Sequence, residues 1–358
     1  MKRITLISKI CIVATLVLLG SWVIPWALNL LLTISYNDSF TLYSPVKKDF
    51  IMRIDQDADK NTHKDTKGNL YNQNEADALM PFFYSRQLMA DGLWPEQIEG
   101  KAYAFRDAQL GTFFFQHAAS DINKPLIGLY QMLESRSGRV NLESPSDVFR
   151  FTDNGMEFID IASNQLLEDK SAKFTKVLND KGFVFPAKTL HGVPSIKKDY
   201  DEGYLVLDNE NKLFHVKQLG GRPYVKAIPV PEGLELQQLF ITEFKDKYTL
   251  GFATCQNDKL HVITRSDYQF HSIDVEGFDA KAASLFVMGT PLYWTVAVTN
   301  DDGKTYYAVD SKTFEIIDRY VVPEPEHNFV YKAKMFLMSW ALHFTSGNDG
   351  FVKPRFGY

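Results

Sequence analysis

The feature that most constrains this chain is an uncharged hydrophobic run near its N-terminus, "ICIVATLVLLGSWVIPWALNLLLTI", from Ile10 to Ile34. The run exceeds the roughly 20 residues that a helix needs to cross a bilayer core. The basic residues Lys2, Arg3 and Lys9 precede it. Asp38 is the first charged residue after it, so the positive-inside rule predicts a cytoplasmic N-terminus and an extracytoplasmic main domain. We therefore interpret residues 1–36 as a cytoplasmic start and a single-pass anchor in the lipid bilayer.

A cleaved signal peptide is the alternative interpretation of the same run. Its apolar region would span about 7–15 residues and end in a small-x-small cleavage site. The segment "VIPWALNLL" offers no such site. Within an uncleaved anchor, Trp22 and Trp26 mark the outer interface. Pro25 either kinks the helix between them or lies within an uninterrupted tilted helix.

Composition excludes several classes of function for the 358-residue chain. A hydrophobic content of 45% is ample for a packed core. The net charge of −5 and pI near 5.9 provide no basic surface for nucleic acid. Of the two cysteines, Cys11 falls inside the hydrophobic run and leaves Cys255 without a partner, which excludes a disulfide framework and a cysteine zinc site.

Residues 140–326 show the alternation and turn signals of antiparallel β structure. Three stretches repeat a strand, a polar turn and a second strand: "GYLVLDNENKLFHVKQ", "LGFATCQNDKLHVITRSDYQFHSIDV" and "YWTVAVTNDDGKTYYAVDSKTFEIIDRYVV". Their matching lysines, Lys212, Lys259 and Lys304, lie 47 and 45 residues apart, as expected for propeller blades. We predict a mainly β, propeller-like domain; an irregular β-sandwich is the alternative.

Two smaller regions flank the β domain. Residues 37–139 mix short helical and strand patterns, such as "NEADALMPFF", and are predicted to form an α+β lead-in. Residues 327–358 are predicted to form an amphipathic helix and tail, because apolar side chains recur there at helical spacing. These side chains are Phe329, Ala333, Phe336, Leu337, Trp340, Ala341 and Phe344. The run is too short for a second membrane span.

The stretch "DQDADKN" is a weak calcium candidate. Asp55, Asp57 and Asp59 match ligand positions 1, 3 and 5 of an EF-hand loop, but Lys60 replaces its glycine and Thr66 its glutamate. The flanking residues read as strands rather than helices. We therefore predict a solvated hairpin tip at this position and no metal site.

Two polar stretches are candidates for binding a ligand or a partner. In "LESRSGR", Glu134 lies beside Arg136 and Arg139, which could clamp a carboxylate or phosphate. The alternative is a salt-bridge network that holds a loop. In "GGRPYV", Arg222 and Tyr224 follow a turn and could face a partner.

A third polar stretch, "KKDYDEG" from Lys197 to Gly203, alternates charges before a strand and is predicted to be a solvated edge. The chain contains no HExxH or HxH pair, no GxSxG elbow, no Walker loop and no GxGxxG turn. We therefore assign no catalytic residue and no cofactor.

Three stretches, "GLYQMLESRSGRVNLESPSDVFRFTDNGMEFID", "FVFPA" and "YDEGYLVLDNENKLFHVKQLGGRPYV", resemble a bacterial family of membrane-anchored proteins of unknown function associated with loci for ABC transporters. The resemblance covers residues 80–230. It implies a protein of the bacterial cytoplasmic (inner) membrane with a periplasmic domain, an accessory to transporter subunits. It carries no catalytic residues. We expect a binding or accessory protein; the alternative is an exported hydrolase or lyase that uses carboxylates such as Glu134 together with Arg136 and Arg139.

Overall fold

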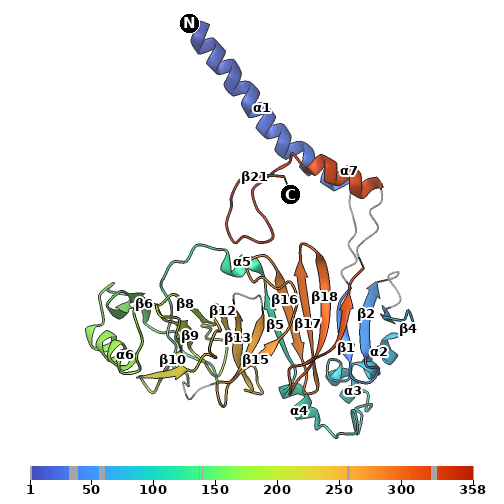
Figure 1. Ribbon diagram of the computed structural model, residues 1–358, viewed down its shortest axis with the longest axis vertical. Coiled ribbons are helices and arrows are strands. Elements are labelled where there is room, and N and C mark those ends of the chain that lie inside the picture. The colour runs from blue at the N-terminus through green and yellow to red at the C-terminus, as the bar shows by residue number, and fades with distance from the viewer. Residues whose placement is uncertain are drawn as a thin grey trace.

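The computed structural model describes residues 2–31, 39–55, 61–136, 138, 140–255, 259–323 and 329–357. One long helix, α1 (Lys2–Leu31), projects from a β-rich body (Figure 1). It continues through Pro25, which agrees with the uninterrupted alternative. Its segment Ile4–Leu31 is long and apolar enough to cross a membrane or to act as a signal sequence.

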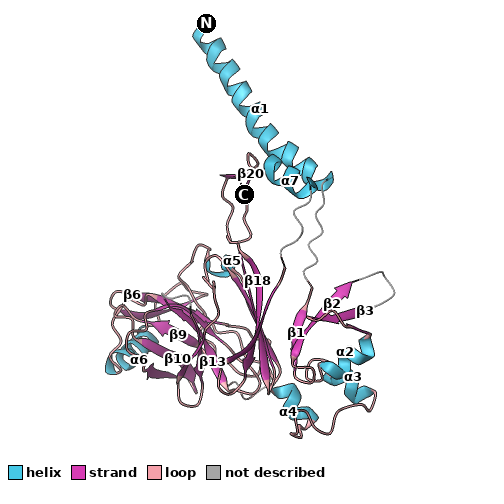
Figure 2. Cartoon of the chain, turned by 45° about the vertical axis from the view of Figure 1, so that its right-hand side comes forward, coloured by secondary structure: helices cyan, strands magenta, loops and turns pink. Residues whose placement is uncertain are grey.

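The body is a row of antiparallel sheets, most of them meanders of strands that are consecutive in the chain (Figure 1, Figure 2). The first sheet contains β1 (Thr41–Ser44), β2 (Asp49–Asp55), β3 (Asn61–Asp65) and β4 (Leu70–Tyr71). The second contains β8 (Thr189–Gly192), β9 (Tyr204–Leu207), β10 (Leu213–Leu219) and β11 (Arg222–Ile228). The third contains β12 (Leu236–Ile241), β13 (Thr249–Cys255), β14 (Leu260–Thr264) and β15 (Phe270–Ile273).

The fourth sheet joins a distant segment of the chain to a meander. The meander contains β16 (Ser284–Gly289), β17 (Tyr293–Asn300), β18 (Gly303–Asp310) and β19 (Ile316–Val321). Strand β5 (Phe113–His117) pairs antiparallel with β16 and forms the edge of the sheet opposite β19. The sheet therefore contains a strand from the segment 37–139 that we predicted as a lead-in.

The predicted repeats correspond to these meanders. The three strand–turn–strand stretches form β9–β10, β13–β15 and β17–β19. A separate hairpin of β6 (Asp147–Thr152) and β7 (Gly155–Asp160) ends the row. The chain is thus mainly β with several antiparallel sheets, and the sheets in the described part of the chain do not close into a ring.

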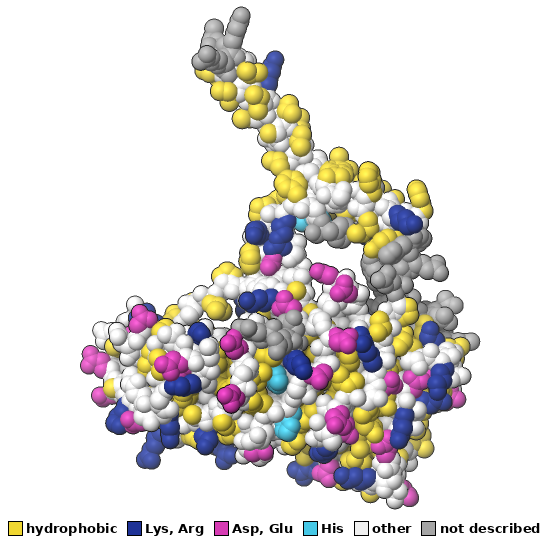
Figure 3. Space-filling model, viewed as in Figure 1, with side chains coloured by type: hydrophobic (Ala, Val, Ile, Leu, Met, Phe, Trp, Pro, Cys, Tyr) yellow, Lys and Arg dark blue, Asp and Glu magenta, His cyan; other side chains and the backbone are white. Residues whose placement is uncertain are grey.

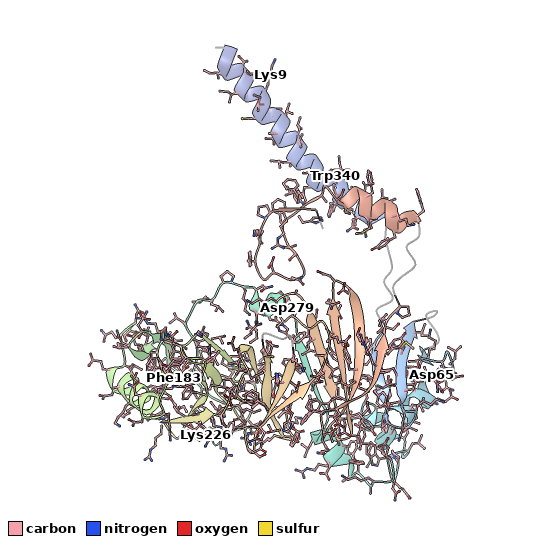
Figure 4. All side chains as sticks on the ribbon, in the orientation of Figure 1. Lys9, Asp65, Phe183, Lys226, Asp279 and Trp340 are labelled. Carbon is pink, nitrogen blue, oxygen red and sulfur yellow. The ribbon has the colours of Figure 1, made fainter. Side chains whose placement is uncertain are left out.

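Aromatic cores join neighbouring sheets. Trp294, Phe252 and Phe314 belong to a core shared by the third and fourth sheets. Another core packs the β6–β7 hairpin and helix α6 (Glu168–Asp180) onto the second sheet, where the Phe183 side chain also lies (Figure 4). Because full burial of a large apolar side chain contributes about 1.5–3 kcal/mol, these cores hold the row together.

Short helices cover the first sheet and the connections. They are α2 (Gln73–Leu79), α3 (Ser85–Ala90), α4 (Phe105–Leu110) and α5 (Ala119–Ile122). Helix α2 lies in the stretch predicted to be helical and begins at a capping box between Asn72 and Glu75.

The C-terminal residues contain helix α7 (Phe329–Met338) and the strand pair β20 (Leu342–His343) and β21 (Arg355–Phe356). The helix ends before Trp340, so the predicted pattern extends beyond it. Because the Leu337 side chain lies outside the described set, the amphipathic character stays a prediction. Both α7 and β20 contact α1, and Trp340 lies at this junction (Figure 4).

Candidate binding cleft

A cleft of ≈ 1230 Å³ opens where three sheets present their edge strands to one another. Strand β5 contributes Phe115 and His117, β8 contributes Leu190 and His191, and β12 contributes Leu236–Ile241. Edge strands carry backbone donors and acceptors that the sheet itself does not use. The cleft therefore offers hydrogen-bonding backbone beside apolar walls.

A strap, residues 123–131, lines the mouth of the cleft. At one end, the backbone of Tyr130 exchanges two hydrogen bonds with Phe149 of β6. The hydroxyl of Tyr204 also donates to the Gln131 carbonyl at 2.6 Å. Between these fixed points and α5, the strap exposes Leu126 and Leu129, which line the cleft. Apolar groups at a cavity mouth favour contact with an apolar partner or ligand.

Two histidines of the cleft are held neutral. The His117 Nε2–H donates to the Ala280 carbonyl at 2.8 Å, and burial lowers the pKa of this ring. The Nδ1 of His191 accepts the backbone N–H of Ile241 at 3.0 Å, so its Nε2 carries the proton. Burial lowers the pKa of His191 to about 4, and protonation of neighbouring His117 would lower it in the same direction. Both rings pack on Phe240.

The remaining lining sets what the cleft can do chemically. Its amides are Gln116, Gln131, Asn211, Gln237 and Gln238, and its charged residues are Asp121, Lys124, Lys188, Glu235 and Lys281. Neutral rings, amides and edge strands can bind and orient a ligand of mixed polarity. Within the described ranges no three His, Cys, Asp or Glu side chains converge as metal ligands.

A buried ionic cluster lies next to the cleft, and the prediction of a solvated edge at Lys197–Gly203 is wrong there. Asp201 and Glu202 are each only 2% exposed. The Glu202 carboxylate pairs with Lys217 at 2.9 Å and with Arg265, whose Nη2 donates to the Tyr200 hydroxyl. We call Tyr200, Glu202, Lys217 and Arg265 the Glu202 cluster. It joins the second and third sheets.

The protonation state of the Glu202 cluster follows from its contacts. Burial raises the pKa of Glu202, but hydrogen bonds from Tyr200 and Lys217 outweigh it and hold that pKa below its usual range. Burial also lowers the pKa of neighbouring His215 to about 4. The His215 Nε2–H accordingly donates to the Glu202 carbonyl at 2.6 Å. The cluster thus contains a charged carboxylate and a neutral ring.

Two further features place Glu202 at this position. Lys198 donates to Glu243 at 2.6 Å and pairs with Asp201 at 2.7 Å. Gly203 has a φ of +74°, and a Cβ there would collide with the Val216 carbonyl oxygen and with Lys217. Glycine is therefore required for the bend that brings Glu202 inside.

The predicted clamp at Glu134 has a different geometry. The Glu134 carboxylate accepts the backbone N–H groups of Gly220 and Gly221 at 2.6 and 2.9 Å. It also accepts Gln218 Nε2 at 3.2 Å. Arg136 is exposed, and Arg139 lies outside the described residues. Glu134 therefore holds the β10–β11 turn, which brings two of the predicted stretches together.

The other predicted positions lie apart from the cleft. Arg222 is exposed at the start of β11, whereas the Tyr224 hydroxyl lies 3.3 Å from that of Tyr268, beside the Glu202 cluster. Of the calcium candidates, Asp57 and Asp59 lie outside the described residues. Asp55 pairs with Asn61 across the β2–β3 hairpin, so strands flank the acidic stretch as predicted.

Comparison with known protein families assigns most of the chain to one domain family. The model of a domain of unknown function, DUF4857, matches residues 40–309. The chain belongs to this family. The match begins near β1 and ends within β18, so the DUF4857 domain contains the cleft, the strap and the Glu202 cluster. A search of curated proteins gives no match to this DUF4857 chain.

Three solved structures show distant likenesses to the DUF4857 chain. One is the dihydro-heme d1 dehydrogenase NirN in complex with DHE, at 11% identity and a TM-score of 0.28, covering 72% of this chain and 75% of that one. Another is the β-propeller domain of Cps50 (Swd1) from Myceliophteria thermophila, at 8% and 0.22, covering 57% and 90%. A third is PorZ of the Porphyromonas gingivalis type-IX secretion system, at 10% and 0.24, covering 80% and 32%. TM-scores this low support no inference.

Proposed function

We propose that this protein is a membrane-anchored, extracytoplasmic binding protein whose ligand site is the cleft between β5, β8 and β12. The observation that carries the proposal is the meeting of three sheet edges around ≈ 1230 Å³ of space. Neutral His117 and His191 and the amides of β5 and β12 supply hydrogen bonds. Binding sites of this kind combine apolar walls with a few orienting polar groups.

We further propose a membrane location and a partner for this protein. The charge distribution around α1 supports a cytoplasmic N-terminus and a periplasmic body in a bacterial inner membrane. The resemblance given above supports an accessory role with the membrane subunits of an ABC-type transporter. In this role the cleft would receive a ligand or a segment of such a subunit beside the membrane.

A carboxylate-dependent hydrolase gains no support from the geometry. A catalytic carboxylate needs access to substrate and a tuned pKa. Glu134 instead accepts backbone N–H groups of the Gly220–Gly221 turn. We therefore propose binding rather than hydrolysis.

Photocrosslinking from the cleft tests this function. Gln237 lies on β12, lines the cleft and is exposed, so we would replace it with benzoylphenylalanine in the full chain and irradiate native membranes. The matched control is the same replacement at Gln87, an exposed amide on α3. We expect discrete adducts, small-molecule or transporter-derived, from position 237 and none from position 87. Identical patterns, or no adduct at 237, would contradict the proposal.

A further inference from the structure

The C-terminal segment, residues 329–357, exposes an unusual density of large apolar side chains. Phe329 is 84% exposed, Phe336 77% and Phe356 65%. The other exposed apolar residues of the segment are Val330, Met335, Trp340, Phe344, Phe351 and Val352. A segment that served only to pack on its own body would bury such side chains, and exposed apolar surface of this kind marks an interaction site.

The segment also carries a positive charge within an acidic chain. It contains the basic residues Lys332, Lys334, Lys353 and Arg355 against a single acidic residue, Asp349. The whole chain has a net charge of −5. Aromatic side chains interspersed with lysines are typical of segments that lie in the interface of an anionic membrane.

The position of the segment continues the apolar surface of α1. The rings of Phe344 and Trp22 meet edge to face, with centroids 5.7 Å apart. Ser21 and Pro25 are buried on α1, where α7 and β20 contact this helix. Figure 3 shows hydrophobic side chains continuing from α1 onto α7, with basic side chains beside them. The segment thus lies at the end of α1 nearest the body.

The same segment is fixed to the body at the cleft. The backbone N–H of Gly350 donates to the Asn123 carbonyl at 2.9 Å, and Asn123 Nδ2 donates to the Asn348 carbonyl at 2.7 Å. A Cβ at Gly350 would lie 2.7 Å from the Ser120 carbonyl oxygen. Asn123 is the first residue of the strap. The segment therefore connects α1 to the mouth of the cleft.

We propose that residues 329–357 lie on the bilayer surface, with their aromatic side chains among the lipid headgroups and their lysines on anionic phosphates. The protein would then contact the bilayer twice, through α1 and through residues 329–357. The second of these contacts holds the strap toward the membrane, so that the cleft faces the bilayer in a fixed orientation. The inference requires α1 to cross a bilayer, but it does not depend on what the cleft binds. A lipid surface fits better than a protein partner because the segment continues the surface of an apolar helix and carries the complementary charge.

Photocrosslinking in defined bilayers tests the proposal. Full-length protein would carry benzoylphenylalanine at Phe336, at Leu16 on α1 as the positive control, or at Leu93, an exposed body residue, as the negative control. Nanodiscs would contain phosphatidylcholine with or without phosphatidylglycerol, and intact-mass spectrometry would identify the adducts. We expect phospholipid adducts at positions 336 and 16 and none at position 93.

Charge reversal tests the role of the lysines. The variant K332E/K334E/K353E is expected to lower the lipid-adduct yield at position 336 roughly tenfold in phosphatidylglycerol nanodiscs. Its effect in pure phosphatidylcholine should be much smaller. The matched control reverses Lys173, Lys176 and Lys181, which are exposed at or beside α6, and should leave the yield unchanged.

The outcomes separate this inference from the anchoring of α1. Lipid adducts at position 16 without any at position 336 would overturn it. So would an adduct from position 336 to a second copy of the chain or to another protein. If position 16 itself formed no lipid adduct, the membrane span would be wrong and the inference would fail with it.

Discussion

The Glu202 cluster joins the second and third sheets, and the cleft adjoins it where the edge of the fourth sheet also meets them, yet the polar groups of the two sites are used in opposite ways. The space beside the cluster and the cleft share Thr242 and Phe244 in their linings. In the cluster, opposite charges pair and leave ≈ 290 Å³. In the cleft, neutral histidines and sheet edges surround ≈ 1230 Å³. Ion pairs thus fill the space between the sheets at the cluster, whereas the cleft remains open and is the ligand site under the proposed function.

The physical reason for this division lies in the cost of burying charge. A buried carboxylate is tolerated only when ion pairs and hydrogen bonds compensate its lost hydration. Glu202 has both Lys217 and Arg265. A ligand site cannot depend on such saturated pairs, because its groups must be available. Neutral His191, with one ring nitrogen engaged by Ile241, meets that requirement.

Removing the Glu202 charge should produce the largest loss of stability, because this carboxylate pairs with two cations that join the second and third sheets. In E202Q the cations of Lys217 and Arg265 lose their buried anion, so we expect the free energy of unfolding to fall by about 3–5 kcal/mol. Chemical denaturation followed by circular dichroism would measure this. The control is E210Q, because Glu210 forms an exposed pair with Lys212. A loss no larger than that of the control would show that the cluster does not fix the sheets.

Lowering the pH should destabilise both sites, because the cleft and the surroundings of Glu202 each contain a neutral histidine with a lowered pKa. The pKa of His215 and of His191 is about 4 in the folded protein, against about 6.5 when unfolded. The unfolded chain therefore binds protons first as the pH falls, and stability is lost between pH 6.5 and 4. For His215 the loss reaches about 3 kcal/mol at pH 4.

The variant H191N separates the contributions of His191 and His215 to the pH dependence of stability. Asparagine at position 191 can still accept the Ile241 N–H but does not titrate. H191N should therefore keep the neutral-pH stability within about 1 kcal/mol and show a shallower pH dependence, with the remaining slope due to the other groups whose pKa is shifted, His215 and His117 among them. Denaturation curves at pH 7.5, 6, 5 and 4 would measure both slopes. Identical slopes for the variant and the wild-type protein would contradict a lowered pKa for His191 in the cleft.

Sequence patterns predicted the elements of this fold better than their assembly. The hairpins of β13–β15 and β17–β19 are local, and alternation with polar turns is enough to predict them. The edge contributed by β5 pairs with β16, far along the chain, and no local pattern reports such pairing. The cleft depends on that edge, so it could not be predicted from the sequence.

The Glu202 cluster was missed for a related reason. Charges in "KKDYDEG" favour a solvated edge on composition alone, because buried acidic residues are rare. The partners of Glu202 are distant in the sequence, since Lys217 lies on β10 and Arg265 directly follows β14. The one local signal was Gly203 between an acidic residue and the apolar β9, since a glycine there permits the chain to turn inward.

Glu134 offers the smallest and most specific test, because it is a carboxylate engaged at the surface rather than in the core. Its oxygens accept the N–H groups of the Gly220–Gly221 turn. In E134Q an NH2 group replaces one carboxylate oxygen and cannot accept a hydrogen bond from the turn. We therefore expect the free energy of unfolding to fall by about 1–2 kcal/mol, less than for E202Q.

The crosslinking experiment gives E134Q a second measurement. If Glu134 only holds the β10–β11 turn, adducts from Gln237 in the cleft will be unchanged by the substitution. The control R136Q removes an exposed charge and should alter stability by no more than about 0.5 kcal/mol. Unchanged stability together with altered adducts would mean that Glu134 contacts the ligand. The functional site would then extend from the cleft to this turn, and the cleft alone could no longer be regarded as the binding site.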